Sequence, residues 1–256
     1  MTNLSVQSDP PLSAGQTLPT MYDLPSENPE EPGLPDEYHS LQPEFLRLTF
    51  KPRNWYPNRL FCGSDINLYY DVKHPNWYKR PDWFGVVGVS RLYEERELRL
   101  SYVVWQEGVD PLVVVELLSP GTEDDDLGKK VRELGKPNTK WEVYERILRV
   151  PYYVAFNRYT NEMQPFCLVG DRYQPAELRN GRLLIPSIEL SLGLWQGSFQ
   201  GIDRLWFRWM TLDGNLILTP EEEAAAAKQE VVDAKQENDR LKARLRELGI
   251  DPEELS

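Results

Sequence analysis

Cysteine and histidine are both scarce in this 256-residue chain, which has two of each. Neither Cys62 nor Cys167 belongs to a CxxC pair, and His39 and His74 have no partners at ligand or triad spacing. Zinc sites and histidine-based triads are therefore unsupported. The GxSxG, P-loop and GxGxxG patterns are also missing, which argues against serine hydrolases, nucleoside triphosphatases and Rossmann domains.

Long hydrophobic runs are missing as well, and no apolar stretch is long enough to span a bilayer. The N-terminal residues MTNLSVQSDPPLSAGQTLP lack both the basic and the apolar region of a secretion signal. Together with the few cysteines, these features predict a soluble, cytoplasmic protein with no membrane partner.

Basic side chains are outnumbered, and the formal net charge is −12. The excess acid lies at the two ends, because residues 1–48 carry 8 acidic and 1 basic side chains and residues 220–256 carry 11 and 6. The segment between them has 22 of each sign. A neutral central region permits a nucleic-acid partner, since a local basic face can still bind phosphates, but it is no evidence for one.

Three regions differ in composition. Residues 1–40 contain seven prolines among Ser, Glu and Asp, which predicts an extended acidic arm. Residues 41–219 are rich in apolar and aromatic side chains and predict one folded domain. Residues 220–256 predict a C-terminal helix.

The central region mixes strand and helix patterns. Residues 112–118 are apolar on both faces apart from Glu116, as expected of a central strand that is covered on both sides. Residues 138–149 have apolar side chains at helical spacing, and Asn138 or Thr139 can cap the first turn. Further strands are predicted at 67–70, 83–89, 101–106, 152–156, 164–169 and 182–192, with a hairpin turn at Asp213–Gly214. This order predicts an α/β fold with a mixed sheet and flanking helices.

Apolar residues repeat every seven positions in the predicted C-terminal helix, 221–248. One row is Ala227, Ala234, Leu241 and Leu248, and the other is Val231, Asn238 and Leu245. Such rows are typical of the d and a positions of a short coiled coil, in which Asn238 would set the register. The pattern predicts a parallel homodimer, and the alternative is a solvated charged helix whose periodicity is accidental.

Four separated blocks carry a family resemblance: SDINLYYD at 64–71, RPDWFGVVGV at 80–89, VVVELLSPGT at 113–122 and KWEVYERILRVPYYVAF at 140–156. Over roughly residues 20–215 the chain resembles the Uma-two family of bacterial endonucleases, within the PD-(D/E)XK restriction-endonuclease-like superfamily. The resemblance implies a restriction-endonuclease-like mixed sheet and nuclease activity.

Two carboxylates stand in these blocks. Glu116 is costly to bury unless it is paired, protonated or bound to a metal, and Asp82, by itself, is typical of a turn or cap. The resemblance implies instead that Asp82 and Glu116 form a metal-binding pair for Mg²⁺, with Mn²⁺ as a substitute, and that the backbone carbonyl of Leu117 is a further ligand.

The lysine of the superfamily motif is displaced, because Leu118 occupies the position two residues after Glu116. The resemblance implies that Lys140, in a KxxxY arrangement with Tyr144, takes its role and supports the attacking water and the scissile phosphate. Lys129 and Lys130 are rival candidates.

Other acidic residues have weaker claims to the site. The run 124–126 predicts a solvated turn or helix start rather than a second metal site, and Asp65 is a minor candidate for an accessory ligand.

The sequence therefore predicts an Mg²⁺-dependent DNA endonuclease with Asp82, Glu116 and Lys140 as catalytic residues. Two alternatives stay open, namely a catalytically silent interaction module with the same fold and a nuclease for RNA or branched nucleic acid.

Overall fold

A six-stranded sheet forms the centre of the computed structural model, which describes residues 36–119, 121–132 and 135–248. Its strands lie in the order β1 (Leu60–Gly63), β4 (Trp83–Val87), β6 (Val113–Leu117), β7 (Tyr152–Asn157), β8 (Glu162–Val169) and β9 (Arg172–Pro175). Only β6 and β7 run parallel, and the other neighbours are antiparallel. The predicted mixed sheet and α/β class are confirmed.

Strand β6 separates two apolar layers because successive side chains of a strand point to opposite faces. Val113, Val115 and Leu117 pack into one core cluster, and Val114 packs into the other. All five residues of the strand are buried, as the pattern of 112–118 predicted. Glu116 has the same parity as Val114 and therefore points toward the second cluster, which contains Tyr144 and Tyr153.

The first layer is built by a helix and a second sheet. Helix α2 (Glu37–Thr49) packs against an antiparallel sheet of β10 (Arg182–Ile185), β11 (Leu190–Phe199) and β12 (Ile202–Thr211). The Gln42 amide joins this sheet edge, because it donates to the carbonyl of Phe207 and accepts from its N–H. The boundary predicted at residues 40/41 falls inside α2, whose Tyr38 is buried.

Two predicted strands are shorter than expected. The segment 101–106 gives only β5 (Tyr102–Val103), because a short helix, α3 (Val104–Glu107), follows it directly. This helix ends at Gly108, whose φ is +68°. The segment 182–192 is interrupted by a 3₁₀ turn, η3 (Pro186–Ile188), since Pro186 cannot donate a ladder hydrogen bond. Strand β5 pairs with β2 (Leu68–Tyr69), which also pairs with β3 (Tyr78–Lys79).

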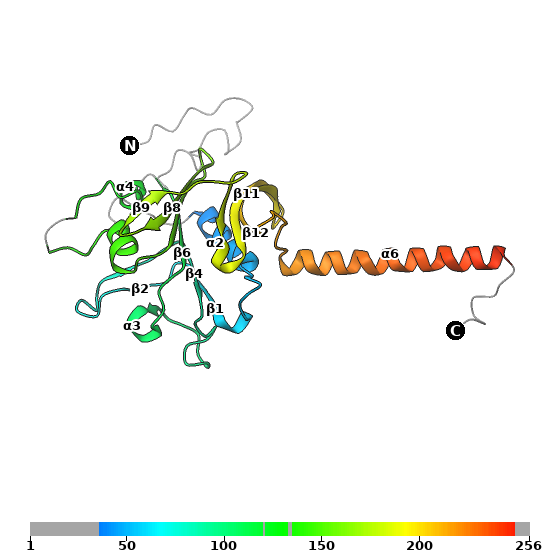
Figure 1. Cartoon of the computed structure of the whole chain (residues 1–256), viewed down its shortest axis with the longest axis horizontal. Coiled ribbons are helices and arrows are strands. Elements are labelled where there is room, and N and C mark those ends of the chain that lie inside the picture. Colours follow the sequence, from blue (N-terminus) through cyan, green and yellow to red (C-terminus); the bar gives the residue numbers. More distant parts are fainter. Residues whose placement is uncertain (1–35, 120, 133–134, 249–256) are drawn as a thin grey trace, which may run out of the picture.

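The remaining helices connect and extend these layers. A short 3₁₀ turn, η1 (Pro57–Arg59), precedes β1, and α4 (Glu123–Asp126) follows β6. The predicted helix 138–149 forms as α5 (Lys140–Glu142) followed by a π turn, η2 (Val143–Ile147). The predicted C-terminal helix forms as α6 (Pro220–Glu247), which projects away from the sheets (Figure 1). None of the helices in the described ranges is long and apolar enough to cross a membrane.

Candidate active site

An ammonium group held between two buried carboxylates is the centre of the site. Lys140 Nζ lies 2.9 Å from Glu116 Oε2 and 2.7 Å from Asp126 Oδ1. The Glu116 and Asp126 side chains are 0% and 1% exposed, whereas that of Lys140 is 17% exposed. Since a buried charge is costly unless it is paired, the three side chains depend on one another for their charged states.

Glu116 is held at both of its carboxylate oxygens. Its Oε2 accepts a hydrogen bond from Lys140, and its Oε1 accepts one from the Tyr144 hydroxyl at 2.9 Å. Burial raises the pKa of Glu116 well above its ordinary range, Lys140 opposes the shift, and the carboxylates of Asp126 and Asp82 add to it. Lys140 therefore favours the ionised form of Glu116 against the effect of burial.

Asp82 lies beside Glu116, immediately before β4. Strand β4 pairs with β6 so that Trp83 faces Val115, and the same register continued by one residue places Asp82 opposite Glu116. Asp82 Oδ2 accepts a hydrogen bond from the Leu117 N–H at 2.6 Å, and the Asp82 N–H donates to Glu116 Oε2 at 3.4 Å. The two carboxylates predicted from the sequence are thus neighbours.

Of the three candidate lysines, the structure brings Lys140 to the carboxylates. Lys129 instead lies 3.6 Å from Glu123, and both Lys129 and Lys130 are exposed. Leu118, which takes the place of the superfamily's usual lysine, is buried. The amine therefore reaches Glu116 from a different element, helix α5.

The sequence did not single out Asp126. The run 124–126 predicts a solvated segment, and Asp124 is exposed, but Asp126 is buried against Lys140. Its backbone carbonyl accepts a hydrogen bond from the Tyr153 hydroxyl at 2.8 Å, which holds α4 against the sheet. Nothing within a run of three identical side chains marks the last one, so only the tertiary structure reveals its role.

A capping box fixes the first turn of α5, where Lys140 lies. The Thr139 hydroxyl accepts a hydrogen bond from the Glu142 N–H at 3.2 Å, and the Glu142 carboxylate accepts one from the Thr139 N–H at 3.2 Å. Of the two predicted caps, Thr139 is the one that forms. The Lys140 N–H also donates to Asp125 Oδ1 at 3.1 Å, so backbone and side chain are both anchored.

Replacing Thr139 with alanine is expected to lower the free energy of unfolding by about 1 kcal/mol, because alanine cannot accept the Glu142 N–H. Urea denaturation followed by circular dichroism measures the change. Thr139→Ser is the control, since it keeps the hydroxyl and should stay close to wild type. Equal losses in both variants would mean that the threonine methyl group, and not the cap, stabilises this turn.

His39 also belongs to the site, although no partner for it was evident in the sequence. Its Nδ1 lies 2.9 Å from Asp36 Oδ1, and its Nε2 lies 3.0 Å from the carbonyl oxygen of Leu117. Both partners are hydrogen-bond acceptors, so this arrangement favours the protonated ring, which can donate from both nitrogens. Burial lowers the pKa of His39, but the Asp36 hydrogen bond and the nearby Asp82 carboxylate raise it, and the net shift is upward.

The N-cap of α2 is Asp36, whose side chain accepts a hydrogen bond from the His39 N–H and so orients this residue. An Asp directly before a helix is a local signal for such a cap. The contact with Leu117 joins residues 78 positions apart, which no local pattern predicts.

A cleft of about 340 Å³ opens beside these residues and is lined by Asp82, Lys140, His39 and Leu117. Neither Glu116 nor Asp126 lines it, and both contact Lys140. Basic side chains from separate segments border this cleft and an adjoining hollow of about 360 Å³, namely Lys79, Arg80, Lys130, Arg132 and Lys136. The segment 49–219, which is neutral overall, therefore gathers basic side chains around these hollows, where Asp65, Asp82 and Asp125 also lie.

Metal ligation was predicted for Asp82, Glu116 and the Leu117 carbonyl. In the described part of the chain, no group of three or more His, Cys, Asp or Glu side chains is placed to hold a metal ion. The predicted pair thus offers two carboxylates, and the Leu117 oxygen is already hydrogen-bonded to His39. Asp65 lines the cleft but forms an ion pair with Arg80 at 2.8 Å.

Comparison with known proteins identifies the family. The family model of Uma2, whose description is "Putative restriction endonuclease", matches residues 16–201, which include Asp82, Glu116 and Lys140. No curated protein matches the chain. The mixed α/β architecture is consistent with a restriction-endonuclease-like fold, and the family description indicates a nuclease. The chain belongs to the Uma2 family.

Proposed function

We propose that the protein is an Mg²⁺-dependent endonuclease that hydrolyses DNA phosphodiester bonds at a site formed by Asp82, Glu116 and Lys140. The observation that carries the proposal is their convergence: β4, β6 and α5 bring two carboxylates and an amine together beside one cleft. Phosphodiester hydrolysis requires charge neutralisation around the phosphate, and carboxylates that can bind a divalent cation, with a lysine beside them, provide it.

The oxygen donors suit Mg²⁺ in kind and in number. Mg²⁺ is usually bound by one or two carboxylates and keeps several waters, and Asp82 and Glu116 offer two. The Leu117 carbonyl would be a third oxygen only through its second lone pair, because it already accepts a hydrogen bond from His39. When bound, the ion would supply Lewis acidity toward the phosphate and lower the pKa of a coordinated water. Mn²⁺ accepts the same donors and is expected to substitute.

The protein's own side chains have separate roles in this proposal. Lys140 offsets negative charge on the scissile phosphate, and its contact with Asp126 retains the ammonium when Glu116 binds a cation. Tyr144 orients the Glu116 carboxylate. Lys79, Lys130, Arg132 and Lys136 around the two hollows bind backbone phosphates, and Arg80 can join them by leaving its ion pair with Asp65. Nucleic acid is therefore the substrate class that this surface fits.

The proposal also includes DNA as the substrate and a second copy of the chain as a partner of α6, as its heptads predict. The pairing of α6 does not depend on the chemistry of the cleft.

The test is cleavage of a mixed panel of duplex, single-stranded and branched DNA and of RNA by the full-length protein with Mg²⁺ or Mn²⁺. Asp82→Asn and Glu116→Gln are expected to lose at least about 10²-fold in rate, since each removes a negative charge that would hold the cation. Asp124→Asn, which changes an exposed carboxylate in the same way, should retain wild-type activity. Mg²⁺ should raise the melting temperature of wild type and not of Asp82→Asn, which reports binding independently of turnover.

Cleavage that is equal in wild type and both site variants would overturn the catalytic assignment. No cleavage of any substrate would favour the silent interaction module, and cleavage of RNA or branched substrates alone would replace duplex DNA as the substrate.

A further inference from the structure

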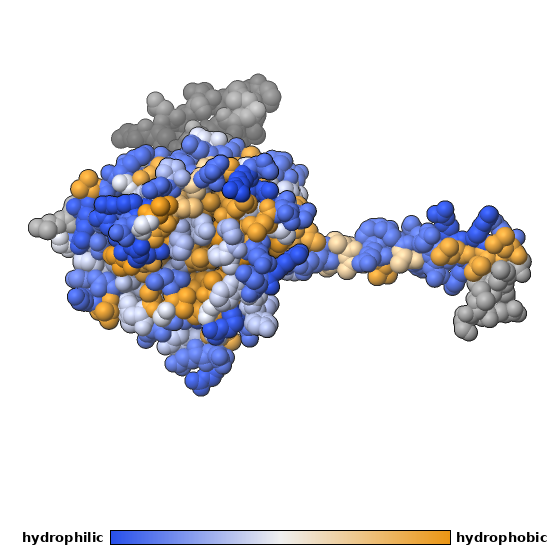
Figure 2. Space-filling model, in the orientation of Figure 1, coloured by the Kyte–Doolittle hydropathy of each residue, from blue (hydrophilic) through white to orange (hydrophobic). Residues whose placement is uncertain are grey.

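Helix α6 has exposed apolar residues along a length of about 42 Å for its 28 residues. None of its residues is buried, and Val231, Leu241 and Leu248, which follows its last turn, are 69%, 55% and 64% exposed. Apolar surface is visible on the outer half of the projecting helix (Figure 2). Exposed valine and leucine side chains that repeat every seven residues along one face indicate a surface that another helix covers.

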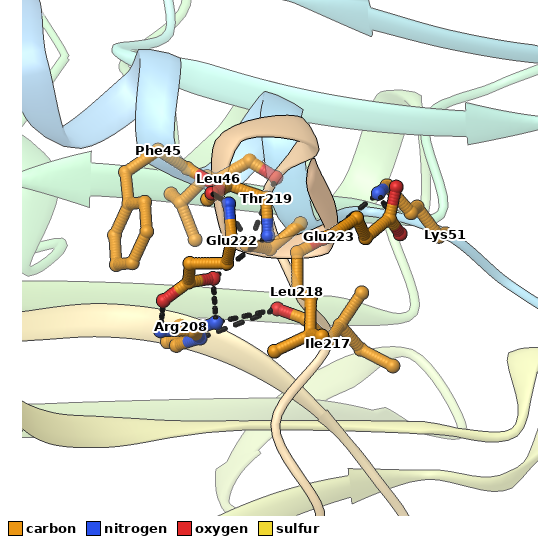
Figure 3. A network of polar contacts seen from close by, with 10 residues as sticks. Phe45, Leu46, Lys51, Arg208, Ile217, Leu218, Thr219, Glu222 and Glu223 are labelled. Atoms are coloured by element: carbon orange, nitrogen blue, oxygen red, sulfur yellow. Dashed lines mark hydrogen bonds and ion pairs between the residues drawn. The ribbon is translucent and has the colours of Figure 1, made fainter. Parts of the chain in front are cut away.

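The first turn of α6 is fixed to the domain. Arg208 of β12, whose side chain is 0% exposed, donates to the Glu222 carboxylate at 2.9 Å and to the Ile217 carbonyl at 2.8 Å (Figure 3). Lys51 donates to the Glu223 carboxylate and to the Leu218 carbonyl, each at 2.8 Å. These contacts set the direction in which the helix leaves the sheets.

Charges beside the apolar rows select the partner. Continuing the heptad assigns Lys228, Lys235 and Lys242 to e positions, and Glu223, Glu230, Glu237 and Arg244 to g positions. In a parallel dimer, a g residue faces the e residue of the next heptad on the other helix, so every one of these glutamates meets a lysine. In an antiparallel pair, g faces g and e faces e, which sets lysine against lysine and, apart from contacts of Arg244, glutamate against glutamate. The e and g charges of the sequence therefore favour the parallel orientation.

We propose that α6 is a self-recognition surface that pairs in parallel and in register with α6 of a second copy of this chain. Asn238 at an a position supports the same register, because a buried amide is satisfied by its equivalent across a parallel dimer. Since the first turn is anchored to the domain, parallel pairing places both domains, and hence both clefts, at the same end of the coiled coil. This inference rests on the proposed function, which names a second copy of the chain as the partner of α6. Its test measures dimerisation and not cleavage, so the pairing and the nuclease activity can each fail without the other.

The test uses two oppositely charged variants of the full-length protein. Glu230→Lys/Glu237→Lys places lysines opposite lysines, and Lys235→Glu/Lys242→Glu places glutamates opposite glutamates. Glu223 is left unchanged because it already contacts Lys51. Sedimentation equilibrium should show wild type at twice the 29.8 kDa chain mass and each variant alone with a dissociation constant raised at least tenfold. An equimolar mixture should restore a dimer that contains one chain of each kind.

The matched control is Asp233→Lys/Asp239→Lys, which makes the same change of charge at outward c and b positions and should remain dimeric. Orientation is read from Ala227→Cys, a d-position residue near the domain. In a parallel dimer it should form a disulfide with its equivalent, above the background given by Cys62 and Cys167 in the unsubstituted protein.

Three results would overturn the proposal: a monomeric wild type at tens of micromolar, charge variants that dimerise alone as wild type does, or a dimer in which Ala227→Cys does not crosslink. The first denies pairing, the second denies selection by the e and g charges, and the third denies the parallel orientation.

Discussion

Replacing Lys140 with methionine is expected to lower the free energy of unfolding by about 3–5 kcal/mol, although it keeps a side chain of similar length. The variant leaves the Glu116 and Asp126 carboxylates buried and facing each other without their shared cation. Removing one member of a buried charge network is costly because the remaining charges can neither reach water nor find another partner.

The loss of stability in Lys140→Met should depend on pH, and the buried carboxylates determine whether it grows or shrinks as the pH rises. Burial raises the pKa of Glu116 and of Asp126 above their ordinary values of 4.5 and 3.8, and in both cases Lys140 opposes the rise. Without the lysine, the folded variant holds protons that the unfolded chain releases, so its stability falls as pH rises above about 4.5. The deficit relative to wild type should therefore be smaller at pH 5 than at pH 8.

Urea denaturation in the presence of EDTA at both pH values measures this difference. Lys130→Met is the control, because it removes an exposed lysine that lines the same cleft and should change the stability by no more than about 0.5 kcal/mol. A Lys140→Met protein as stable as the control, or one whose deficit grows toward low pH, would contradict the proposed dependence of the carboxylates on Lys140.

The framework around the site was predictable because its signals are local. The apolar run 112–118 predicts a doubly covered central strand, and the helical spacing after Thr139 predicts the helix that carries Lys140. Block order then places Asp82 and Glu116 on strands of one sheet. The local signal gave the wrong structure at Val104–Glu107, whose composition favours a strand. This segment forms a helical turn that ends at Gly108.

The surroundings of the site were less predictable because they depend on long-range contacts. Asp126 has the same side chain as its two exposed or half-exposed neighbours, and only the approach of α5 makes it a partner of Lys140. His39 reaches Leu117 from the other end of the domain, within a segment that composition assigned to the acidic arm. The group of basic side chains around the two hollows is likewise assembled from residues 79–136, whose overall charge gives no hint of it.

Replacing Glu222 with alanine is expected to destabilise the domain by about 3 kcal/mol, even though this glutamate lies in the first turn of the projecting helix. Its loss leaves the Arg208 guanidinium, 0% exposed, with the Ile217 carbonyl and no counter-charge. Arg208 also lies over the rings of Trp195 and Phe45, at 4.4 Å and 5.2 Å from their centroids, so it cannot turn to solvent without opening the core. Thermal and urea denaturation of the full-length protein measure the loss.

Two variants separate the ion pair from other functions of Glu222. Glu221→Ala removes an exposed carboxylate from the same helical turn and should cost no more than about 0.5 kcal/mol, which accounts for the helix dipole. Arg208→Met/Glu222→Ala removes both charges and should cost less than the two single changes added together, because no unpaired charge remains. Strict additivity would show that the two residues stabilise the protein independently, and the anchoring of α6 would then depend on its capping box and on Lys51. A large coupling would instead show that the pair of buried Arg208 and half-buried Glu222 anchors α6 together with Lys51 and the capping box, and so contributes to the placement of two domains on one coiled coil.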